Sequence, residues 1–238
     1  MVVSARRAEI LEEVARGIAS TGGRAMAVPG DVTRPPEMDA LVARAVESFG
    51  RLDVMICNAG IGFHGSIADS TPEVARRLVE TNVLGTMHAA RAACGQFARQ
   101  GSGHVIAVSS MAGVRGVPGM SVYSATKAAQ AAFIEALRSE FVGTRLRASV
   151  VFPVSAPTEL RRQMTRAFGA ATPATGPRQS VDAIADAIVR CVVSQPPEVF
   201  PYRRGRWLAL MTALAPAWSD RFMRRFDRRR EARDGRSA

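Results

Sequence analysis

Three residues that can move a proton to or from an oxygen atom, Ser110, Tyr123 and Lys127, occur within one short stretch of this sequence. Residues 104–108 have the apolar character of a buried strand, and a helical pattern begins near Ser121 after a Gly/Pro loop. Tyr123 and Lys127 are four residues apart, so a helix places them on one face about one turn from each other. We expect the loop to return Ser110, thirteen residues before Tyr123, to that face.

A tyrosine that works as an acid or base near pH 7 must have its pKa lowered from near 10, which takes about 4 kcal/mol. A fixed ammonium group beside the phenolate lowers the pKa in this way. Lys127 is the only lysine among the 32 basic residues of the chain. A Tyr-x-x-x-Lys spacing also occurs where a solvated lysine lies below a structural tyrosine. The single lysine argues against that interpretation, because a compact, rotatable ammonium is what arginine cannot supply.

Length and composition indicate one large α/β domain, since 238 residues of 47% hydrophobic content can fill a substantial core. Cys57, Cys94 and Cys191 are odd in number and widely separated, so they predict neither a disulfide framework nor a metal site. The N-terminus lacks the long apolar run of a signal peptide or a membrane span. We therefore expect a cytoplasmic protein without a metal.

The order of the expected elements predicts the fold. Strands are expected at residues 2–4, 24–29, 52–57, 104–108, 146–152 and 198–202. Helices are expected at residues 8–20, 36–49, 71–100, 121–142 and 181–193. Their alternation predicts a doubly wound, mainly parallel sheet with helices on both faces, a Rossmann-like α/β fold. Asn82 lies inside one of these helices, where an asparagine is unfavourable unless its side chain has a partner.

With these motifs placed, residues 2–202 resemble the short-chain dehydrogenase/reductase family in its classical branch. Asn58, Ala59 and Gly60 are similar to the family's Asn-Ala-Gly turn, which supports the central sheet beside the cofactor. Asp31 and Val32 are similar to the pair that holds the adenine ring. The resemblance covers several motifs in the right order and spacing.

The resemblance implies that Asn82, Ser110, Tyr123 and Lys127 form a catalytic tetrad. Tyr123 would exchange a proton with the substrate oxygen, and Ser110 would hydrogen-bond that oxygen. Lys127 would lower the tyrosine pKa and bind the nicotinamide ribose hydroxyls, so Tyr123 and Lys127 would both contact the cofactor. Asn82 would hold a water that links Lys127 to solvent. The cofactor itself supplies the hydride.

The cofactor preference is expected to depend on the residues that follow the first strand. An acidic residue there suits the ribose 2′-hydroxyl of NAD, and an arginine suits the 2′-phosphate of NADP. This chain has Arg6 and Arg7 and no acid, which favours NADP(H) with Arg6 as the contact. The alternative is that both arginines are solvated charges at a helix start. Further along, Pro153 and Thr158 match the family's segment at the nicotinamide.

Two departures from the family stand out. The strand and the Thr-Gly-x-x-x-Gly-x-Gly turn that precede the position of Val2 in the family are absent, so we expect a sheet that is incomplete at the N-terminus. That turn normally holds the pyrophosphate. The chain is then either a fragment of a normal enzyme or a truncated paralogue that binds cofactor poorly. In the second departure, Val154 replaces a glycine and restricts the backbone there.

Residues 203–238 form a basic, partly apolar tail with eleven arginines against four acidic residues, a net charge of +7. Its apolar part, residues 207–218, is too short to span a bilayer. Such a segment fits either a peripheral contact with anionic lipids or a helix that closes the substrate pocket. No nucleic-acid module accompanies the charge, so no nucleic-acid partner is expected.

The substrate is expected to be lipophilic, because a flap at residues 154–179 and the tail supply apolar side chains for a pocket: Met164, Phe168, Trp207, Leu208 and Met211. Phe63 and His64 are expected to face the same pocket. For His64, a position on the surface is the alternative. The resemblance implies a homodimer or homotetramer formed through helices 72–100 and 121–142.

The sequence as a whole predicts an NADP(H)-dependent oxidoreductase that interconverts a carbonyl and a primary or secondary alcohol, with Tyr123 as general acid/base. The alternative, motivated by the absent phosphate turn and the basic tail, is a catalytically silent binding or scaffold protein at a membrane surface.

Overall fold

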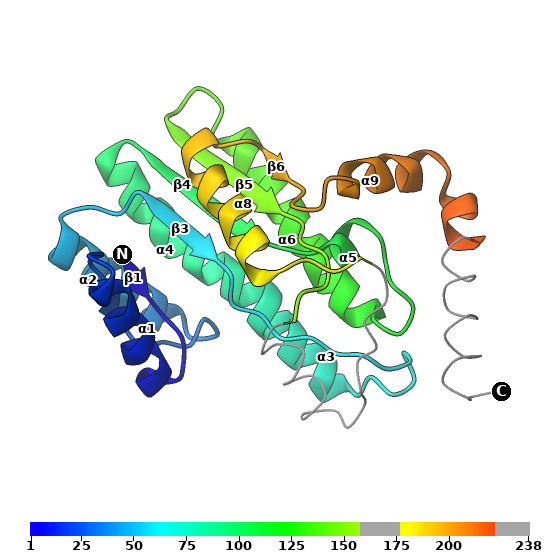
Figure 1. Cartoon of the computed structure of the whole chain (residues 1–238), viewed down its shortest axis with the longest axis horizontal. Coiled ribbons are helices and arrows are strands. Elements are labelled where there is room, and N and C mark those ends of the chain that lie inside the picture. The colour runs from blue at the N-terminus through cyan, green and yellow to red at the C-terminus, as the bar shows by residue number, and fades with distance from the viewer. Residues whose placement is uncertain (158–176, 222–238) are drawn as a thin grey trace.

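The computed structural model describes residues 1–157 and 177–221 (Figure 1). Its strands are β1 (Val2–Val3), β2 (Met26–Ala27), β3 (Val54–Cys57), β4 (Gly103–Val108), β5 (Leu146–Val151) and β6 (Glu198–Val199). Its helices are α1 (Ala8–Ser20), α2 (Pro35–Phe49), α3 (Pro72–Leu78), α4 (Gly85–Gln100), α5 (Met111–Val114), α6 (Ser121–Glu140), α8 (Val181–Ser194) and α9 (Gly205–Leu214), with a π-helical segment η1 (Val79–Leu84) between α3 and α4. Strands and helices alternate as the sequence predicted.

All strand pairs in the described residues are parallel. One sheet has the order β3-β4-β5-β6, and β1 pairs with β2 in a separate two-stranded unit. No ladder joins β1 to β3 in the part of the chain that the structure describes. The sheet is therefore divided where the sequence predicted it to be incomplete.

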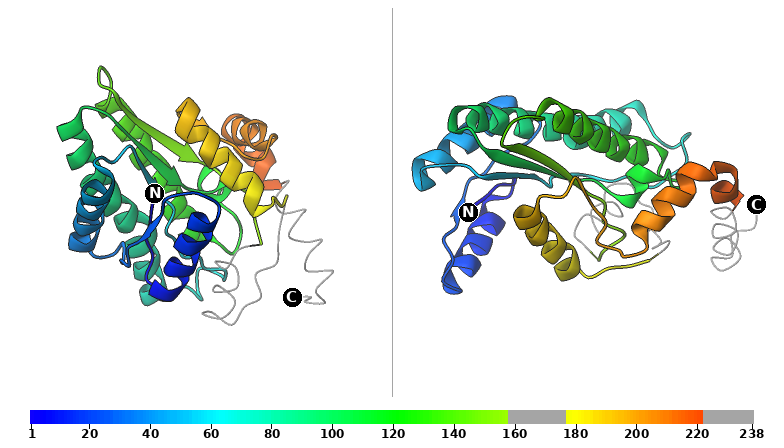
Figure 2. Two further views of the ribbon diagram at one scale, coloured as in Figure 1. Left: turned by 60° about the vertical axis from the view of Figure 1, so that its left-hand side comes forward. Right: turned by 90° about the horizontal axis from the view of Figure 1, so that it is seen from above.

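Helices cover both faces of the four-stranded sheet, which confirms the doubly wound architecture (Figure 2). Strand side chains alternate between the two faces. Val105 of β4 belongs to the core beneath α4 and α6, which also contains the fully buried Phe97 and Ile134. Ile106, one residue later, packs on the other face with Cys191 of α8. Burial on both faces explains why this strand is apolar throughout.

The long helix predicted over residues 71–100 begins as expected, with Thr71 accepting a hydrogen bond from the Val74 amide at 3.3 Å. It is not uniform, however, because η1 interrupts it around Asn82. A π-helical turn admits one extra residue per turn and is common at functional sites. The interruption turns Asn82 into the protein interior, where its side chain is fully buried.

The remaining differences concern the segments after β4 and β5. The Gly/Pro loop after β4 contains the short helix α5, which the sequence did not predict. Ser155 and Arg178 form an isolated bridge at the base of the expected flap, most of which lies outside the described residues. Among the described helices, none combines the length and the apolar character needed to cross a membrane.

Candidate active site

Ser110 and Tyr123 come together at the carboxyl end of β4. Ser110 is the N-cap of α5, and its Oγ accepts a hydrogen bond from the Ala112 amide at 3.1 Å. Tyr123 lies in the first turn of α6 and is buried. Helix α5 packs tightly on α6, since a Cβ at Gly113 would lie 2.7 Å from the Lys127 carbonyl carbon. Ser110 lies close enough to Tyr123 for its hydroxyl to act on the tyrosine pKa, so the loop returns it to that face as expected.

Lys127 is buried one turn below Tyr123, with Nζ 5.8 Å from the tyrosine ring centroid. The ammonium donates hydrogen bonds to the Val108 carbonyl oxygen and to Gln130 Oε1, each at 2.9 Å. Burial lowers the pKa of Lys127 to about 8, because desolvation disfavours the charged form. This single lysine is therefore held by fixed acceptors in the interior.

The pKa of the Tyr123 phenol is raised by burial, and the hydrogen bond with Ser110 only partly opposes that effect. This direction is opposite to the one expected from the lysine four residues away. The physical reason is that removing water from a phenolate costs more than the neighbouring hydroxyl returns. In the described structure Tyr123 therefore holds its proton at neutral pH.

Asn82 joins three elements of the site. Its Oδ1 accepts from the Ile61 amide at 2.8 Å, and its Nδ2 donates to the Ile61 carbonyl oxygen at 2.9 Å and to Thr126 Oγ1 at 3.0 Å. Thr126 Oγ1 in turn donates to the Tyr123 carbonyl oxygen at 2.7 Å. The sequence predicted that Asn82 needs a partner, and the structure supplies the Ile61 backbone after β3 and Thr126 in the second turn of α6.

The Asn-Ala-Gly turn follows β3 directly. Asn58 and Ala59 are exposed. A Cβ at Gly60 would lie 3.2 Å from Asn82 Oδ1 and 3.6 Å from Lys127 Nζ. Glycine thus keeps the backbone close to the tetrad, where a larger residue would displace its polar atoms.

Arg6 and Asp31 lie close enough to interact at the ends of β1 and β2. Burial raises the pKa of Asp31, but hydrogen bonds from Thr33 and the charges of Arg6 and Arg34 outweigh it and lower the pKa. The Thr33 amide and hydroxyl both donate to Asp31 Oδ1, at 2.9 and 2.8 Å. The Val32 carbonyl oxygen accepts from the His88 ring, also at 2.9 Å. Two predicted cofactor contacts therefore share one electrostatic environment.

Pro153 follows β5, and its carbonyl oxygen accepts from the Met111 amide at 2.9 Å, which ties the end of β5 to α5 beside Ser110. Thr158 lies outside the described residues. The candidates that follow β3, β4 and β5 thus meet at the carboxyl edge of one parallel sheet, where α/β proteins bind ligands.

A family sequence profile described as "short chain dehydrogenase" matches residues 1–168. The chain belongs to this family. An uncharacterized oxidoreductase of Listeria innocua is 34% identical over 167 residues, which are 69% of this chain and 67% of that protein. The ketoacyl reductase HetN of Nostoc is 32% identical over 192 residues, 79% of this chain and 67% of HetN. The crystal structure of a 3-ketoacyl-ACP reductase from Sinorhizobium meliloti superposes with a TM-score of 0.71 at 27% identity, covering 84% of this chain and 86% of that one.

This short-chain dehydrogenase has two buried polar residues in its site that the sequence did not single out. Gln130 accepts from Lys127 and donates through Nε2 to Thr86 Oγ1 at 2.6 Å. Thr86 Oγ1 donates to the Asn82 carbonyl oxygen at 2.8 Å. The available signal was spacing, since Gln130 lies three residues after Lys127 and Thr86 four after Asn82, and both fall on helices.

The predicted substrate pocket is only partly supported. Phe63 is buried in a cluster with Tyr123, Leu78 and Ala112. His64 lies beside Gly119, where a Cβ would meet its Nε2 at 3.1 Å.

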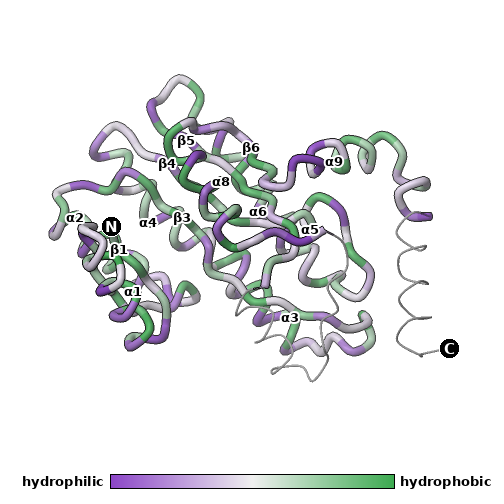
Figure 3. Tube along the Cα trace, viewed as in Figure 1, coloured by the Kyte–Doolittle hydropathy of each residue, from purple (hydrophilic) through white to green (hydrophobic). Residues whose placement is uncertain are grey.

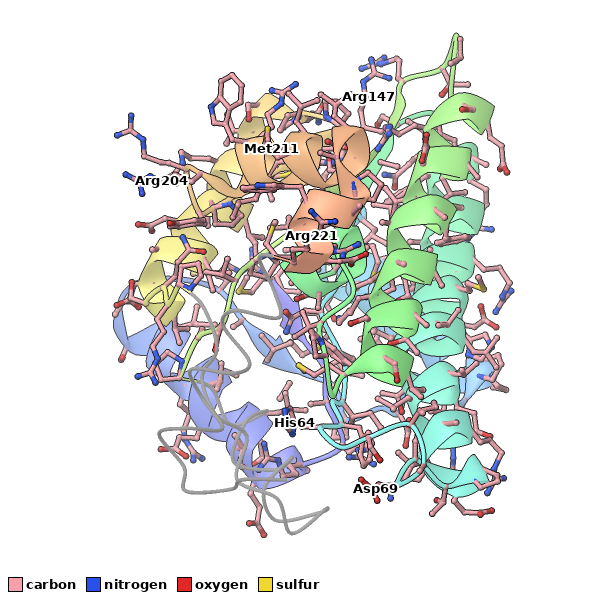
Figure 4. The ribbon with its side chains drawn as sticks, turned by 90° about the vertical axis from the view of Figure 1, so that its right-hand side faces the viewer. His64, Asp69, Arg147, Arg204, Met211 and Arg221 are labelled. Atoms are coloured by element: carbon pink, nitrogen blue, oxygen red, sulfur yellow. The ribbon has the colours of Figure 1, made fainter. Side chains whose placement is uncertain are left out.

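Three tail residues expected in that pocket, Trp207, Leu208 and Met211, are instead exposed on α9. Figure 4 shows Met211 well away from His64. The prediction was wrong for these three because α9 turns them outward. Met164 and Phe168 lie outside the described residues.

Proposed function

We propose that this short-chain dehydrogenase is an NADP(H)-dependent oxidoreductase that interconverts a carbonyl group and a primary or secondary alcohol on a lipophilic substrate. The single observation that carries the proposal is the arrangement of the buried Tyr123 and Lys127 beside the half-buried Ser110, with Tyr123 joined through Thr126 to Asn82. Polar groups that are costly to bury are concentrated at the ligand-binding edge of the sheet.

In the direction of reduction, Tyr123 donates its proton to the substrate oxygen. Because burial raises its pKa, the phenol is protonated at neutral pH, and donation of the proton depends on neighbouring groups that stabilise the phenolate. Ser110 hydrogen-bonds the same oxygen and stabilises the charge that develops on it. Lys127 places a positive charge beside Tyr123 and favours the phenolate left after the transfer. Lys127 then returns a proton to the Tyr123 phenolate. Asn82 fixes the turn at Ile61 and holds the water through which Lys127 regains its proton from solvent.

The residues around the site fit a nicotinamide cofactor, which supplies the hydride. Gly60 keeps its backbone beside Lys127, and a Cβ there would crowd Asn82 Oδ1 at 3.2 Å. Two sets of residues would hold the cofactor. At the adenosine end they are Arg6, Asp31 and Val32, and nearer the nicotinamide they are Asn58, Ala59, Gly60, Tyr123, Lys127, Pro153 and Thr158. Arg6 supports NADP(H) as the cofactor.

A lipophilic substrate is supported by the apolar cluster around Tyr123, in which Phe63 and Leu78 are buried and Val117 and Met120 are partly buried. The relatives named as ketoacyl reductases make an acyl chain the first class of substrate to test. We also propose a cytoplasmic homodimer or homotetramer assembled through α4 and α6, which lie side by side on one face of the sheet (Figure 2).

The deciding experiment is a titration of the chain with NADPH, followed by turnover with β-ketoacyl thioesters and hydrophobic ketones. We expect saturable binding and substrate-dependent oxidation of NADPH. If the chain binds NADPH but turns over none of the carbonyl compounds, that result counts against the proposed oxidoreductase activity. If it neither binds NADPH nor turns over a carbonyl compound, the catalytically silent scaffold is favoured.

A further inference from the structure

Helix α9 turns its small residues inward and its large apolar residues outward. Gly205 is buried, and a Cβ there would lie 3.2 Å from Phe200 and 3.3 Å from Met111 Sδ. Ala209 and Thr212 are half-buried on the same side. Five large apolar residues of α9 are exposed, one of them Leu208 at 42%. The other four share one side of the helix and are 69, 47, 43 and 72% exposed in the order Trp207, Leu210, Met211 and Leu214.

These four residues, which we call the α9 face, follow one another at spacings of three, one and three, so they form one stripe along the helix. A helix that packs on its own domain has the opposite pattern, with the large apolar side chains buried. Figure 3 shows the hydrophobic colouring of α9, and Figure 1 shows the helix extending from the body of the molecule. A contiguous exposed apolar surface marks a site of interaction.

Contacts at both ends keep the α9 face outward. At its start, Gly205 packs under Met111 and Phe200, and its amide donates to the Tyr202 carbonyl oxygen at 2.7 Å. Beyond its end, Ser219 is buried, and Asp220 forms an ion pair with Arg115 of the loop before α6. The orientation of the stripe is thus fixed by the fold.

The charges around the α9 face identify its partner. Arg203, Arg204 and Arg206 are exposed at the start of α9, and Arg221 is exposed seven residues beyond its end at Leu214. Figure 4 shows Arg204 and Arg221 on the same side of the molecule as Met211. The one acidic residue among positions 203–221, Asp220, is paired with Arg115. A second copy of this chain would bring like charges together, whereas an anionic surface is attracted.

We propose that the α9 face binds a membrane surface rich in anionic lipids. The apolar side chains enter the boundary between head groups and acyl chains, and the surrounding arginines contact the head groups. Tryptophan suits that boundary because its ring is apolar and its N–H is polar. The proposal is independent of the oxidoreductase chemistry.

The test is co-sedimentation of the full chain with vesicles, either of phosphatidylcholine alone or of equal parts of phosphatidylcholine and phosphatidylglycerol. We expect binding to the anionic vesicles that high salt weakens. Each arginine near such a surface contributes about fivefold to partitioning, so Arg203→Gln with Arg204→Gln and Arg206→Gln should weaken binding by at least about tenfold.

Trp207→Ser with Leu214→Ser should abolish the apolar contribution and reduce binding to a similar or greater extent. The matched control is Val142→Ser with Val193→Ser, since these valines are 80 and 81% exposed on other elements. The control should bind like the unaltered chain. Circular dichroism checks that each variant is folded.

Three results would overturn the proposal. The first is no binding to anionic vesicles by the unaltered chain, and the second is equal binding to neutral and anionic vesicles. The third is a change to a smaller species on gel filtration for Trp207→Ser with Leu214→Ser while vesicle binding is unchanged. That last result would show that a second copy covers the α9 face.

Discussion

At the scale of single residues, the site is organised around a buried phenol beside a buried ammonium. The pKa of Tyr123 is raised and that of Lys127 is lowered to about 8, in both cases because burial disfavours the charged form. Before the reaction, the Tyr123 phenol is therefore protonated, and Lys127 can exchange a proton near neutral pH. This is a suitable starting state for reducing a carbonyl.

The cofactor preference is tested at Arg6, with Arg7 as the matched control. Arg6→Ala should weaken NADPH binding by about 10- to 100-fold, because it removes a charge-assisted hydrogen bond to the 2′-phosphate, and should change NADH binding little. Arg7→Ala should change neither. Fluorescence titration with both cofactors measures this. An equal loss for NADPH and NADH, or the same loss in both variants, would contradict the assignment of Arg6.

The spacing of Ser110, Tyr123 and Lys127 was enough to predict that they meet. It was not enough to predict the direction of the tyrosine pKa, because the extent of burial depends on how α5 packs over α6. Gln130 and Thr86 were missed for a related reason. A polar residue in a helix pattern is usually exposed, and only the packed structure shows that these two are 1 and 3% exposed.

At the scale of elements, the segment α3–η1–α4 positions the asparagine. Both flanking helices have apolar faces, and the π-helical turn between them shifts the register so that Asn82 points at Ile61. Hydrophobic periodicity predicted one continuous helix, because a single inserted residue hardly alters the pattern of the flanks.

A pair of glycines in this segment gives a prediction with an internal control. A Cβ at Gly85 would lie 2.6 Å from Val32 Cγ2, so Gly85→Ala should lower the free energy of unfolding by about 1–3 kcal/mol. At Gly95, in the same helix α4, there is open space, so Gly95→Ala should raise it by about 0.5–1 kcal/mol. Urea unfolding compares them. Changes of the same sign would contradict the close packing of α4 on Val32.

At the scale of the whole molecule, alternation of strands and helices predicted the parallel sheet and its two covered faces. The apolar residues of the tail predicted that this segment contacts another surface, but they did not predict which surface. Trp207 and Met211 were therefore assigned to the pocket, whereas α9 turns them away from it. What covers an apolar stripe depends on where neighbouring elements anchor the helix, here through Gly205 and Asp220.

His104 links global stability to pH. It is buried at the start of β4, and its Nε2 is 2.8 Å from Ser149 Oγ, while its Nδ1 has no hydrogen-bond partner among the residues that the structure describes. Burial, with a smaller contribution from the charge of Arg147, lowers its pKa to about 4.

The unfolded chain takes up a proton at this histidine near pH 6.5, so stability is fully present above about pH 6.5 and falls towards pH 4. The loss should reach roughly 2 kcal/mol by about pH 5. His104→Gln should remove most of it, and His88→Gln should not. Urea unfolding of each variant at about pH 6.5 and about pH 5 measures how much the free energy of unfolding falls between the two pH values. An unchanged pH dependence in His104→Gln would contradict the assignment.

The most direct test of the central claim compares the turnover of the Tyr123→Phe and Tyr202→Phe variants. Tyr202→Phe is the matched control, since the chain has two tyrosines and each variant loses one hydroxyl. NADPH-dependent reduction of a carbonyl substrate should fall by at least about a hundredfold in Tyr123→Phe, because general acid catalysis is lost. Its thermal unfolding should change little, and Tyr202→Phe should keep full activity. Turnover by Tyr123→Phe at the rate of the unaltered chain would contradict the account.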